Sequence, residues 1–273
     1  MPYFETSTDG TRLAYEDYGT GQPIVLVSSW VLNADMWEYQ IPYFTERGYR
    51  CIALDRRGHG RSDRPSGGYD MDTVADDLAA LLERLDLREV TLVGHSMGGC
   101  EIARYLARHG ESRVAKVAFV SATLPFLMQT EDNPDGAPEA VLMGSLAQLR
   151  RDRPNWFAQQ AQVWYGTHLG NAVSPALIEW TIAQCLSASP RATTELFRSH
   201  VTTDFRAGLR EITVPVLIVH GAADSAADVD LTARRTVQLV PHSTYKEYPT
   251  ASHGLFVTHQ DELNADLLEF IKS

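Results

Sequence analysis

The residues whose types and spacing most clearly suggest catalysis form the run Gly94-His95-Ser96-Met97-Gly98, which has the spacing G-x-S-x-G. A serine at the centre of this pattern, placed between a strand and a helix, sits on a tight turn that requires small neighbours. Its hydroxyl then points out above the edge of a sheet, where the start of the helix directs backbone N–H groups. We therefore predict that Ser96 is a nucleophile.

A serine nucleophile needs a base to take its proton, and the base needs an acid to orient it. In folds that carry this serine turn, the chain order is serine, then Asp or Glu, then histidine. Asp224 comes shortly after the apolar run Val216–Val219, and His253 follows the extended segment Tyr245–Tyr248. We predict that His253 is the general base and that Asp224 orients it.

Other titratable residues have simpler interpretations. Asp228 and Asp230 compete with Asp224 for the role of the acid. His95 flanks the nucleophile and must point away from it, and His109 ends a predicted helix, where an imidazole suits the dipole. No H-E-x-x-H motif or cluster of His, Cys and Asp predicts a metal site. The other histidines, which we expect to be mostly structural or exposed, are His59, His168, His200, His220, His242 and His259.

A second polar run, Asp55–Ser62, reads D-R-R-G-H-G-R-S. Its glycines and arginines raise the question of phosphate binding. The run is not a Walker loop, and no predicted helix follows immediately to present N–H groups to a phosphate. We favour a structural turn that is held by hydrogen bonds of its Asp and Arg side chains.

The predicted elements alternate between strands and helices. Two extended segments, Tyr3–Thr6 and Arg12–Tyr18, flank Asp9-Gly10 and predict a hairpin. Short apolar runs typical of parallel strands buried on both faces are Ile24–Val27, Cys51–Leu54, Val90–Val93, Val117–Val120 and Val216–Val219. Amphipathic helical patterns are Asp72–Leu85, Ile102–Leu106 and Leu263–Ile271. This alternation predicts βαβ units, an α/β fold and a mostly parallel sheet.

The alternation breaks in one long segment. Residues 124–208 contain the polar, turn-rich stretch Glu131–Pro138 and several helical patterns, with no good strand signal. We predict a core domain of residues 1–123 and 209–273, with residues 124–208 as a helical cap inserted over one end of the sheet. Aromatic residues of the cap either pack within it or form walls of a pocket beneath it, and they are Trp156, Phe157, Trp164, Tyr165 and Trp180.

Composition narrows the classes of partner. The chain has 273 residues, enough to bury a substantial core, and a formal net charge of −11, which repels the phosphate backbone of nucleic acids. Its three cysteines are widely spaced and form no C-x-x-C pair, which indicates free thiols in a reducing compartment. The first residues show no signal-peptide pattern, and no apolar run approaches the ~18 residues of a membrane helix. We expect a soluble cytoplasmic protein with no nucleic-acid or membrane partner.

Taken together, the motifs D-R-R-G-H-G-R-S, G-H-S-M-G-G, H-G-x-x-D and S-H-G resemble those of the α/β-hydrolase superfamily. Within it, the chain is most similar to bacterial non-haem chloroperoxidases and related aryl esterases. The similarity covers nearly the whole chain and is weakest in residues 124–208. It implies an α/β-hydrolase fold, a mostly parallel twisted sheet with helices on both faces, and a triad of Ser96, His253 and Asp224. It also implies that the protein uses no haem, no metal and no other cofactor.

The resemblance also implies an oxyanion hole and a pocket. The backbone N–H groups of Met97 and Trp30 would bind the oxyanion. Val31, Thr123 and Leu127 would line the acyl pocket, although Thr123 and Leu127 fit a packing role equally well.

The sequence departs from the family pattern beside the predicted oxyanion hole. It has Ser28-Ser29 where the family usually has His-Gly before the tryptophan. A serine at a positive φ would cost on the order of 1 kcal/mol. Either the loop keeps its shape and gains hydroxyl donors, or the second oxyanion N–H is misplaced, which typically lowers the rate ~10²–10³-fold.

These features predict a carboxylic-ester hydrolase that acts on small esters through an acyl-enzyme. Relatives that favour peracid formation tend to have proline after the oxyanion tryptophan, so Val31 favours plain ester hydrolysis. Lactone or lactam opening, carbon–carbon bond hydrolysis and peracid formation on the same triad stay open, as does a ligand-binding protein with little turnover. Dehalogenases and epoxide hydrolases are disfavoured because their nucleophile is Asp where Ser96 stands. The expected partner is a small-molecule ester or lactone, and a homo-oligomer is also left open.

Overall fold

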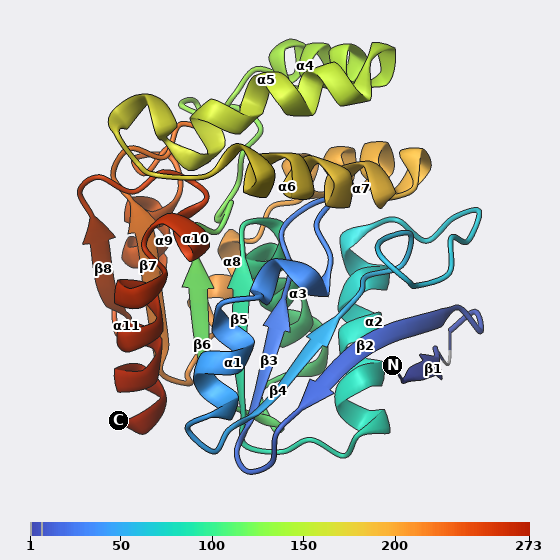
Figure 1. The fold of residues 1–273 in the computed structure, drawn as a ribbon, viewed down its shortest axis with the longest axis vertical. Helices are drawn as coiled ribbons and strands as arrows, with labels where there is room; N and C mark the ends of the chain where they lie inside the picture. The colour runs from blue at the N-terminus through green and yellow to red at the C-terminus, as the bar shows by residue number, and fades with distance from the viewer. Residues whose placement is uncertain (1, 7) are drawn as a thin grey trace.

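The computed structural model describes residues 2–6 and 8–273, whose strands form one eight-stranded sheet (Figure 1). The strand order is β1-β2-β4-β3-β5-β6-β7-β8. The strands are β1 (Tyr3–Glu5), β2 (Arg12–Tyr18), β3 (Pro23–Val27), β4 (Arg50–Leu54), β5 (Val90–His95), β6 (Val114–Val120), β7 (Val216–Gly221) and β8 (Thr244–Tyr248). β1 and β2 are antiparallel to their neighbours, and all pairs from β4 to β8 are parallel. The turn between β1 and β2 includes Ser7, which lies outside the described residues.

Helices cover both faces of the sheet and one of its ends (Figure 1). The α-helices are α1 (Gln40–Thr45), α2 (Met71–Arg84), α3 (Met97–His109), α4 (Glu139–Arg151), α5 (Arg153–Tyr165), α6 (Pro175–Ser187), α7 (Pro190–Thr202), α8 (Arg206–Arg210), α9 (Ala233–Leu239), α10 (Leu255–Thr258) and α11 (Gln260–Lys272). Two short 3₁₀ helices are η1 (Ala34–Trp37) and η2 (Thr167–Leu169).

The central strands are apolar throughout because helices cover both of their faces. Along β3, Val25 and Val27 pack in the core layer that contains α2, α3 and α9. Ile24 and Leu26 point the other way, into the layer that contains α11. Since successive side chains of a strand alternate between faces, an unbroken apolar run is what a doubly covered strand requires.

The structure confirms the predicted α/β fold and mostly parallel sheet. Every predicted strand is present, and the main differences are at the boundaries. β6 begins at Val114, three residues before the predicted run, and α2 begins at Met71. The start of α2 is fixed by Asp70, whose side chain accepts a hydrogen bond from the Thr73 amide as an N-cap.

The described residues of the segment 124–208 contain α4 to α7, η2 and the first residues of α8, and they contribute no strand to the sheet. In Figure 1, α6 and α7 lie across the end of the sheet to which the arrows of β3 to β8 point, and α4 and α5 lie beyond them. Loops that leave the carboxyl ends of these strands therefore run directly beneath the four helices.

The strand order brings loops from distant parts of the chain together. β3 pairs with β5, so the loop that begins at Ser28 lies beside the turn at Ser96. β7 pairs with β8, so the loops that carry Asp224 and His253 are also neighbours. The chain moves outward from β3 to β4 and then returns to β5, which makes this the point where the strand order reverses. Binding sites in open parallel sheets form at such points.

Among the described residues, no helix is long and apolar enough to span a membrane.

Candidate active site

Ser96 lies on a strained turn between β5 and α3. Its backbone has φ 55° and ψ −123°, a combination that non-glycine residues rarely adopt. A Cβ on Gly94 would come within 2.6 Å of the Gly98 carbonyl oxygen, and a Cβ on Gly98 would overlap the Val27 carbonyl oxygen. The two glycines of the motif are thus required by close backbone contacts, and these contacts hold Ser96, which is 5% exposed, in its conformation on the turn.

The structure brings Ser96, His253 and Asp224 into one hydrogen-bonded series. The Nε2 atom of His253 lies 2.9 Å from the Ser96 Oγ. The Nδ1 atom of the same ring lies 2.7 Å from the Asp224 Oδ2. A carboxylate accepts only, so the Nδ1 carries a proton and, in the neutral ring, Nε2 is left as the acceptor for the serine hydroxyl.

Asp224 is held ionised by its surroundings. Burial acts to raise the pKa of its carboxyl, but the adjacent His253 and hydrogen bonds to the carboxylate hold that pKa below its usual range. The backbone amides of Ala226 and Ala227 donate to its Oδ1 at 3.0 and 2.8 Å. The carboxylate is therefore fixed on both oxygens, one by the chain and one by the imidazole.

The two predicted oxyanion donors come from the chain segments that follow the paired strands β3 and β5. Trp30 follows β3, and Met97 is the first residue of α3. Among the described residues, neither backbone amide donates a hydrogen bond in a turn or to a side chain, so both remain available. The Trp30 ring is anchored by its own Nε1, which donates to the Thr193 carbonyl of α7 at 3.0 Å.

Having Ser28-Ser29 where the family usually has His-Gly does not create backbone strain at either serine. Neither residue has a positive φ, which instead falls on Val31, with φ 60°. The Ser28 hydroxyl donates to the Asn33 carbonyl at 2.9 Å, and the Ser29 hydroxyl is buried without a partner among the described residues. Neither serine is among the residues that line the cavity described below. The loop thus uses Ser28 to close its own turn.

Arg56 holds this loop against α3. Its Nη2 donates to the Ser28 carbonyl at 2.8 Å, and its Nε donates to the Glu101 Oε2 at 2.6 Å. The run Asp55–Ser62 is thus a turn tied by its Asp and Arg side chains, as predicted. Asp55 adds a second tie, accepting from the Ala34 amide at 2.9 Å and from the Arg61 amide at 2.8 Å.

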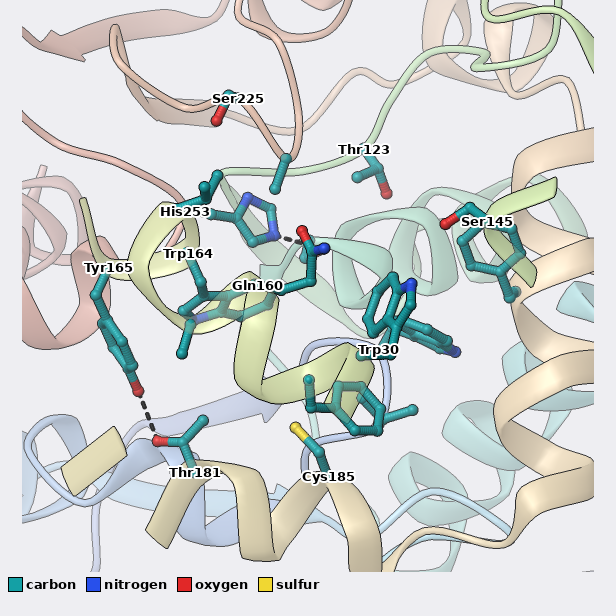
Figure 2. Close-up of a pocket in the computed structure, with 18 of the residues that line it drawn as sticks. Trp30, Thr123, Ser145, Gln160, Trp164, Tyr165, Thr181, Cys185, Ser225 and His253 are labelled. Carbon is teal, nitrogen blue, oxygen red and sulfur yellow. Dashed lines mark hydrogen bonds between the residues drawn. The ribbon is translucent and has the colours of Figure 1, made fainter. Parts of the chain in front are cut away.

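A cavity of about 470 Å³ opens beside Ser96 and His253, beneath the four helices. The predicted pocket residues Val31, Thr123 and Leu127 all line it. In Figure 2, Trp164 lies close to His253, whereas Trp30 and Ser145 lie on the other side of the cavity. The predicted cap aromatics that reach the cavity are Trp156, Phe157, Trp164 and Tyr165, while Trp180 is not among its lining residues.

Comparison with known proteins identifies the group to which this arrangement belongs. The family model described as the alpha/beta hydrolase fold matches residues 22–260. The chain belongs to the α/β-hydrolase family. It is 42% identical to a non-heme haloperoxidase from Rhodococcus erythropolis and 36% identical to a bifunctional esterase/perhydrolase from Acinetobacter calcoaceticus, with at least 99% of both chains covered in each comparison. It also superimposes on an esterase from Exiguobacterium antarcticum with a TM-score of 0.95 at 32% identity, covering both chains fully.

In this α/β hydrolase, the end of α5 holds the loop that carries His253. The Ser252 Oγ donates to the Val163 carbonyl at 2.6 Å, and the Gly254 amide donates to the Trp164 carbonyl at 2.7 Å. The Trp164 ring packs edge-on against the His253 ring, with 4.4 Å between centroids. The imidazole is therefore held by the end of α5 as well as by Asp224.

The competing acids have other contacts in this hydrolase. Asp228 accepts from the Asp230 and Leu231 amides, and Asp230 pairs with Arg234 at 2.7 Å. His95 points away from the serine, as predicted, and its Nε2 lies 2.8 Å from the His253 carbonyl. Burial lowers the pKa of His95 to about 3, which keeps the ring neutral.

Two histidines that we expected to be structural or exposed contact the site or line its cavity. His220, at the end of β7, has its Nε2 3.4 Å from the Asp224 Oδ2 and 2.7 Å from the Ala227 carbonyl. His200, on α7, lines the cavity. The spacing H-G-x-x-D places His220 four residues before the acid and could have indicated the first contact. No local signal marks His200, because its position depends on how α7 packs over the sheet.

Among residues 2–6 and 8–273, no group of three or more His, Cys, Asp or Glu side chains is arranged to hold a metal ion. The three cysteines are buried and unpaired, and burial raises the pKa of each thiol to about 12. Cys185 lines the cavity, and Cys100 contacts Thr123, with 3.3 Å between Sγ and Oγ1. At neutral pH these thiols are protonated and are weak nucleophiles.

Proposed function

We propose that this α/β hydrolase cleaves small carboxylic esters through an acyl-enzyme formed on Ser96. The observation that carries the proposal is the hydrogen-bonded series of Ser96 Oγ, His253 and Asp224. Ser96 and His253 line a largely apolar cavity of about 470 Å³. The likeness to an esterase from Exiguobacterium antarcticum and to a bifunctional esterase/perhydrolase supports the same chemistry.

In the first half-reaction, the Ser96 Oγ forms a bond to the ester carbonyl carbon while His253 Nε2 takes the hydroxyl proton. The Asp224 carboxylate stabilises the resulting imidazolium through Nδ1. The negative charge on the former carbonyl oxygen is accepted by the Trp30 and Met97 amides. When the tetrahedral intermediate collapses, the bond to the alcohol oxygen breaks, and that oxygen takes the proton from His253.

In the second half-reaction, water replaces the alcohol. His253 removes a proton from the water as its oxygen bonds to the acyl carbon. The new intermediate breaks the bond to the Ser96 Oγ, which regains its proton from the imidazole. The products are an alcohol and a carboxylic acid, and Ser96, His253 and Asp224 return to their starting protonation states.

Hydrolysis of p-nitrophenyl acetate tests the proposal directly. The wild-type protein should release p-nitrophenol and Ser96→Ala should lose activity by at least ~10³-fold, because alanine offers no nucleophile. Ser145→Ala is the matched control: Ser145 also lines the cavity but lies on α4, and its variant should stay within a few-fold of wild type. Equal activity of wild type and Ser96→Ala, or saturable binding of the ester without turnover by wild type, would contradict the proposal.

Peracid formation would use the same acyl-enzyme, with hydrogen peroxide attacking in place of water. The backbone at Val31 supports plain hydrolysis instead. Its φ of 60° is far from the φ near −65° that a proline ring imposes, so this loop has a shape that proline does not adopt. When hydrogen peroxide is added to the ester assay, water and peroxide compete for the same acyl-enzyme. We expect the carboxylic acid, and not the peracid, to remain the main product. A peroxide-dependent halide-oxidation assay measures the alternative.

A further inference from the structure

His200 is a buried imidazole that the proposed mechanism does not use. It lies on α7, its side chain is 6% exposed, and it lines the cavity that contains Ser96. Its Nδ1 lies 3.3 Å from the Leu196 carbonyl oxygen one helical turn earlier. A carbonyl oxygen only accepts, so the Nδ1 carries the proton, and the neutral ring leaves Nε2 as a hydrogen-bond acceptor.

The Nε2 atom of His200 has no hydrogen-bond partner among the described residues, and it is not one of the side-chain atoms that are fully enclosed without a partner. The unpartnered atoms of the other buried histidines, such as His59 Nε2 and His95 Nδ1, are fully enclosed. The His200 side chain lines the cavity and its Nε2 keeps accessible surface, and on these two observations we assign the cavity as the space that Nε2 faces. Burial lowers the pKa of His200 to about 4, so the ring is neutral and the acceptor is free at neutral pH.

The position of His200 relates it to one part of an ester. The His200 ring packs edge-on against Phe197 at 5.6 Å between centroids, and Phe197 packs against Trp30 at 5.3 Å. The alcohol of an ester must leave beside His253 Nε2, and Figure 2 shows His253 and Trp30 on different sides of the cavity. The Trp30 side, where His200 lies, is thus left for the acyl group.

The chemistry of the remaining wall limits what His200 can bind. Among the described residues that line the cavity, none is Asp, Glu, Lys or Arg. A carboxylate on the acyl group would face an acceptor with no cation in the cavity lining, since Arg56, the charge that acts on the His200 ring, does not line the cavity and is paired with Glu101. An ammonium would lose its water without gaining an anion. A hydrocarbon would leave Nε2 buried without a partner. A neutral hydroxyl or N–H is the group that satisfies it.

We infer that His200 is a specificity-determining residue that gives this enzyme a preference for esters whose acyl group carries a neutral hydrogen-bond donor, such as a hydroxyl. This inference rests on the proposed ester hydrolysis. Aromatic hydroxy acids fit the cavity best, since Trp30, Trp156, Phe157 and Phe197 supply ring faces and edges next to His200.

The test compares p-nitrophenyl esters of phenylacetic acid with those of its 2-, 3- and 4-hydroxy derivatives. At least one hydroxy isomer should have a kcat/KM about tenfold above the parent ester, and an ester of 4-carboxyphenylacetic acid should be poorer than the parent. In His200→Phe, which keeps a ring of similar size, the ratio of kcat/KM between the hydroxy esters and the parent ester should fall to about one. His200→Gln, which retains a side-chain acceptor, should keep part of the preference.

The outcomes separate the inference from the proposed function. If wild type hydrolyses the parent ester as fast as every hydroxy isomer, or if His200→Phe keeps the preference, the inference is wrong while ester hydrolysis stands. If wild type hydrolyses none of the esters, the proposed function fails. Binding of the same esters to Ser96→Ala, followed by tryptophan fluorescence, then decides the inference: a Kd about tenfold lower for a hydroxy isomer, lost on adding His200→Phe, supports it, and equal Kd values overturn it.

Discussion

Arg56 and Glu101 form a buried ion pair, 2.6 Å from Nε to Oε2, that joins the two backbone segments on either side of the proposed oxyanion site. Neither side chain is more than 2% exposed. Glu101 lies on α3, one turn after Met97, and the same guanidinium holds the Ser28 carbonyl two residues before Trp30. The separation of the Trp30 and Met97 amides therefore depends on one planar group that bonds to both segments.

Replacing Arg56 should affect both stability and turnover. Arg56→Met leaves the Glu101 carboxylate buried without its partner, which costs about 3–5 kcal/mol of unfolding free energy. It also releases the Ser28 carbonyl, so kcat for p-nitrophenyl acetate should fall ~10-fold or more while the variant is still folded. Urea unfolding and steady-state kinetics below the unfolding transition measure the two effects.

A second buried ion pair provides the control for Arg56. Arg57 Nε lies 2.6 Å from the Asp77 Oδ2 of α2, and neither residue lines the cavity. Arg57→Met should lose a similar unfolding free energy but keep kcat within a few-fold of wild type. If both variants lose kcat equally, Arg56 acts on overall stability and not on the oxyanion site.

The close backbone contacts of the glycines beside Ser96 predict that a larger residue will not fit there. A Cβ at Gly98 would overlap the Val27 carbonyl oxygen, so Gly98→Ala should push β3 and α3 apart and lower the unfolding free energy by about 1–3 kcal/mol. Activity should fall more than 10²-fold because the Ser96 turn and both oxyanion amides move.

Gly144 is the matched control, since it lies within α4 and nothing surrounds the position of its Cβ within 4 Å. Gly144→Ala should raise the unfolding free energy by up to about 1 kcal/mol through helix propensity and leave turnover unchanged. A fully active Gly98→Ala protein would show that the turn has more room than the backbone contacts indicate.

Acid should destabilise the fold through its buried histidines. Burial lowers the pKa of His59 and His95 to about 3 and that of His200 to about 4, against about 6.5 in the unfolded chain. Between about pH 6.5 and pH 4 the unfolded state binds more protons than the folded state. The unfolding free energy therefore falls as pH falls, by up to about 1.4 kcal/mol per pH unit for each histidine.

His200→Phe isolates one of these groups. The slope of unfolding free energy against pH between pH 6 and pH 5 should be shallower in this variant, by the equivalent of up to one proton. Urea unfolding at closely spaced pH values gives the slope directly. An unchanged slope would mean that His200 binds its proton equally well in the folded and unfolded chain.

The hydrogen bond from Ser252 to α5 should matter for turnover. Ser252→Ala removes the bond from its Oγ to the Val163 carbonyl, which costs about 1 kcal/mol and loosens the loop that carries His253. We expect kcat to fall several-fold with KM nearly unchanged. Ser187→Ala removes a comparable bond to the Gln184 carbonyl at the end of α6, and it should leave kcat at the wild-type value. Equal kcat in both variants would contradict a role for the α5 contact.

Local constraints explain which parts of this molecule are predictable from the sequence. The Ser96 turn is predictable because its two glycines are required by contacts within a few residues of the serine and with the neighbouring strand. The proximity of Asp224 and His253 follows from chain order and from the parallel strands that precede them. The first signal is a requirement for small residues next to the serine, and the second is the order of strands and loops along the chain, and both can be read from the sequence.

The remaining features depend on long-range packing. Arg56 reaches Ser28 and Glu101 only because β4, β3 and α3 meet, and the run D-R-R-G-H-G-R-S shows a turn without showing its partners. Val31 carries the positive φ of its loop although it is β-branched, which no propensity would indicate. The apolar residues of α4, α5 and α6 face the cavity and one another, so none of these three helices shows a strong periodic face, whereas α7 does. The starts of α5, α6 and α7 do carry local signals, the N-caps Asp152, Ser174 and Ser189 with proline in the first turn, which were not used in predicting these helices.

The bonds on either side of His253 limit how this enzyme admits its substrate. If the whole insertion swung away as one lid, the end of α5 would pull Ser252 and Gly254 with it and draw the imidazole off the serine. A substrate that enters without displacing α5 leaves the proton-transfer geometry intact. Val141 of α4 lines the cavity and is 61% exposed, so this side chain borders both the cavity and the solvent. Substrate entry past α4 would therefore leave the α5 contacts that hold the His253 loop in place.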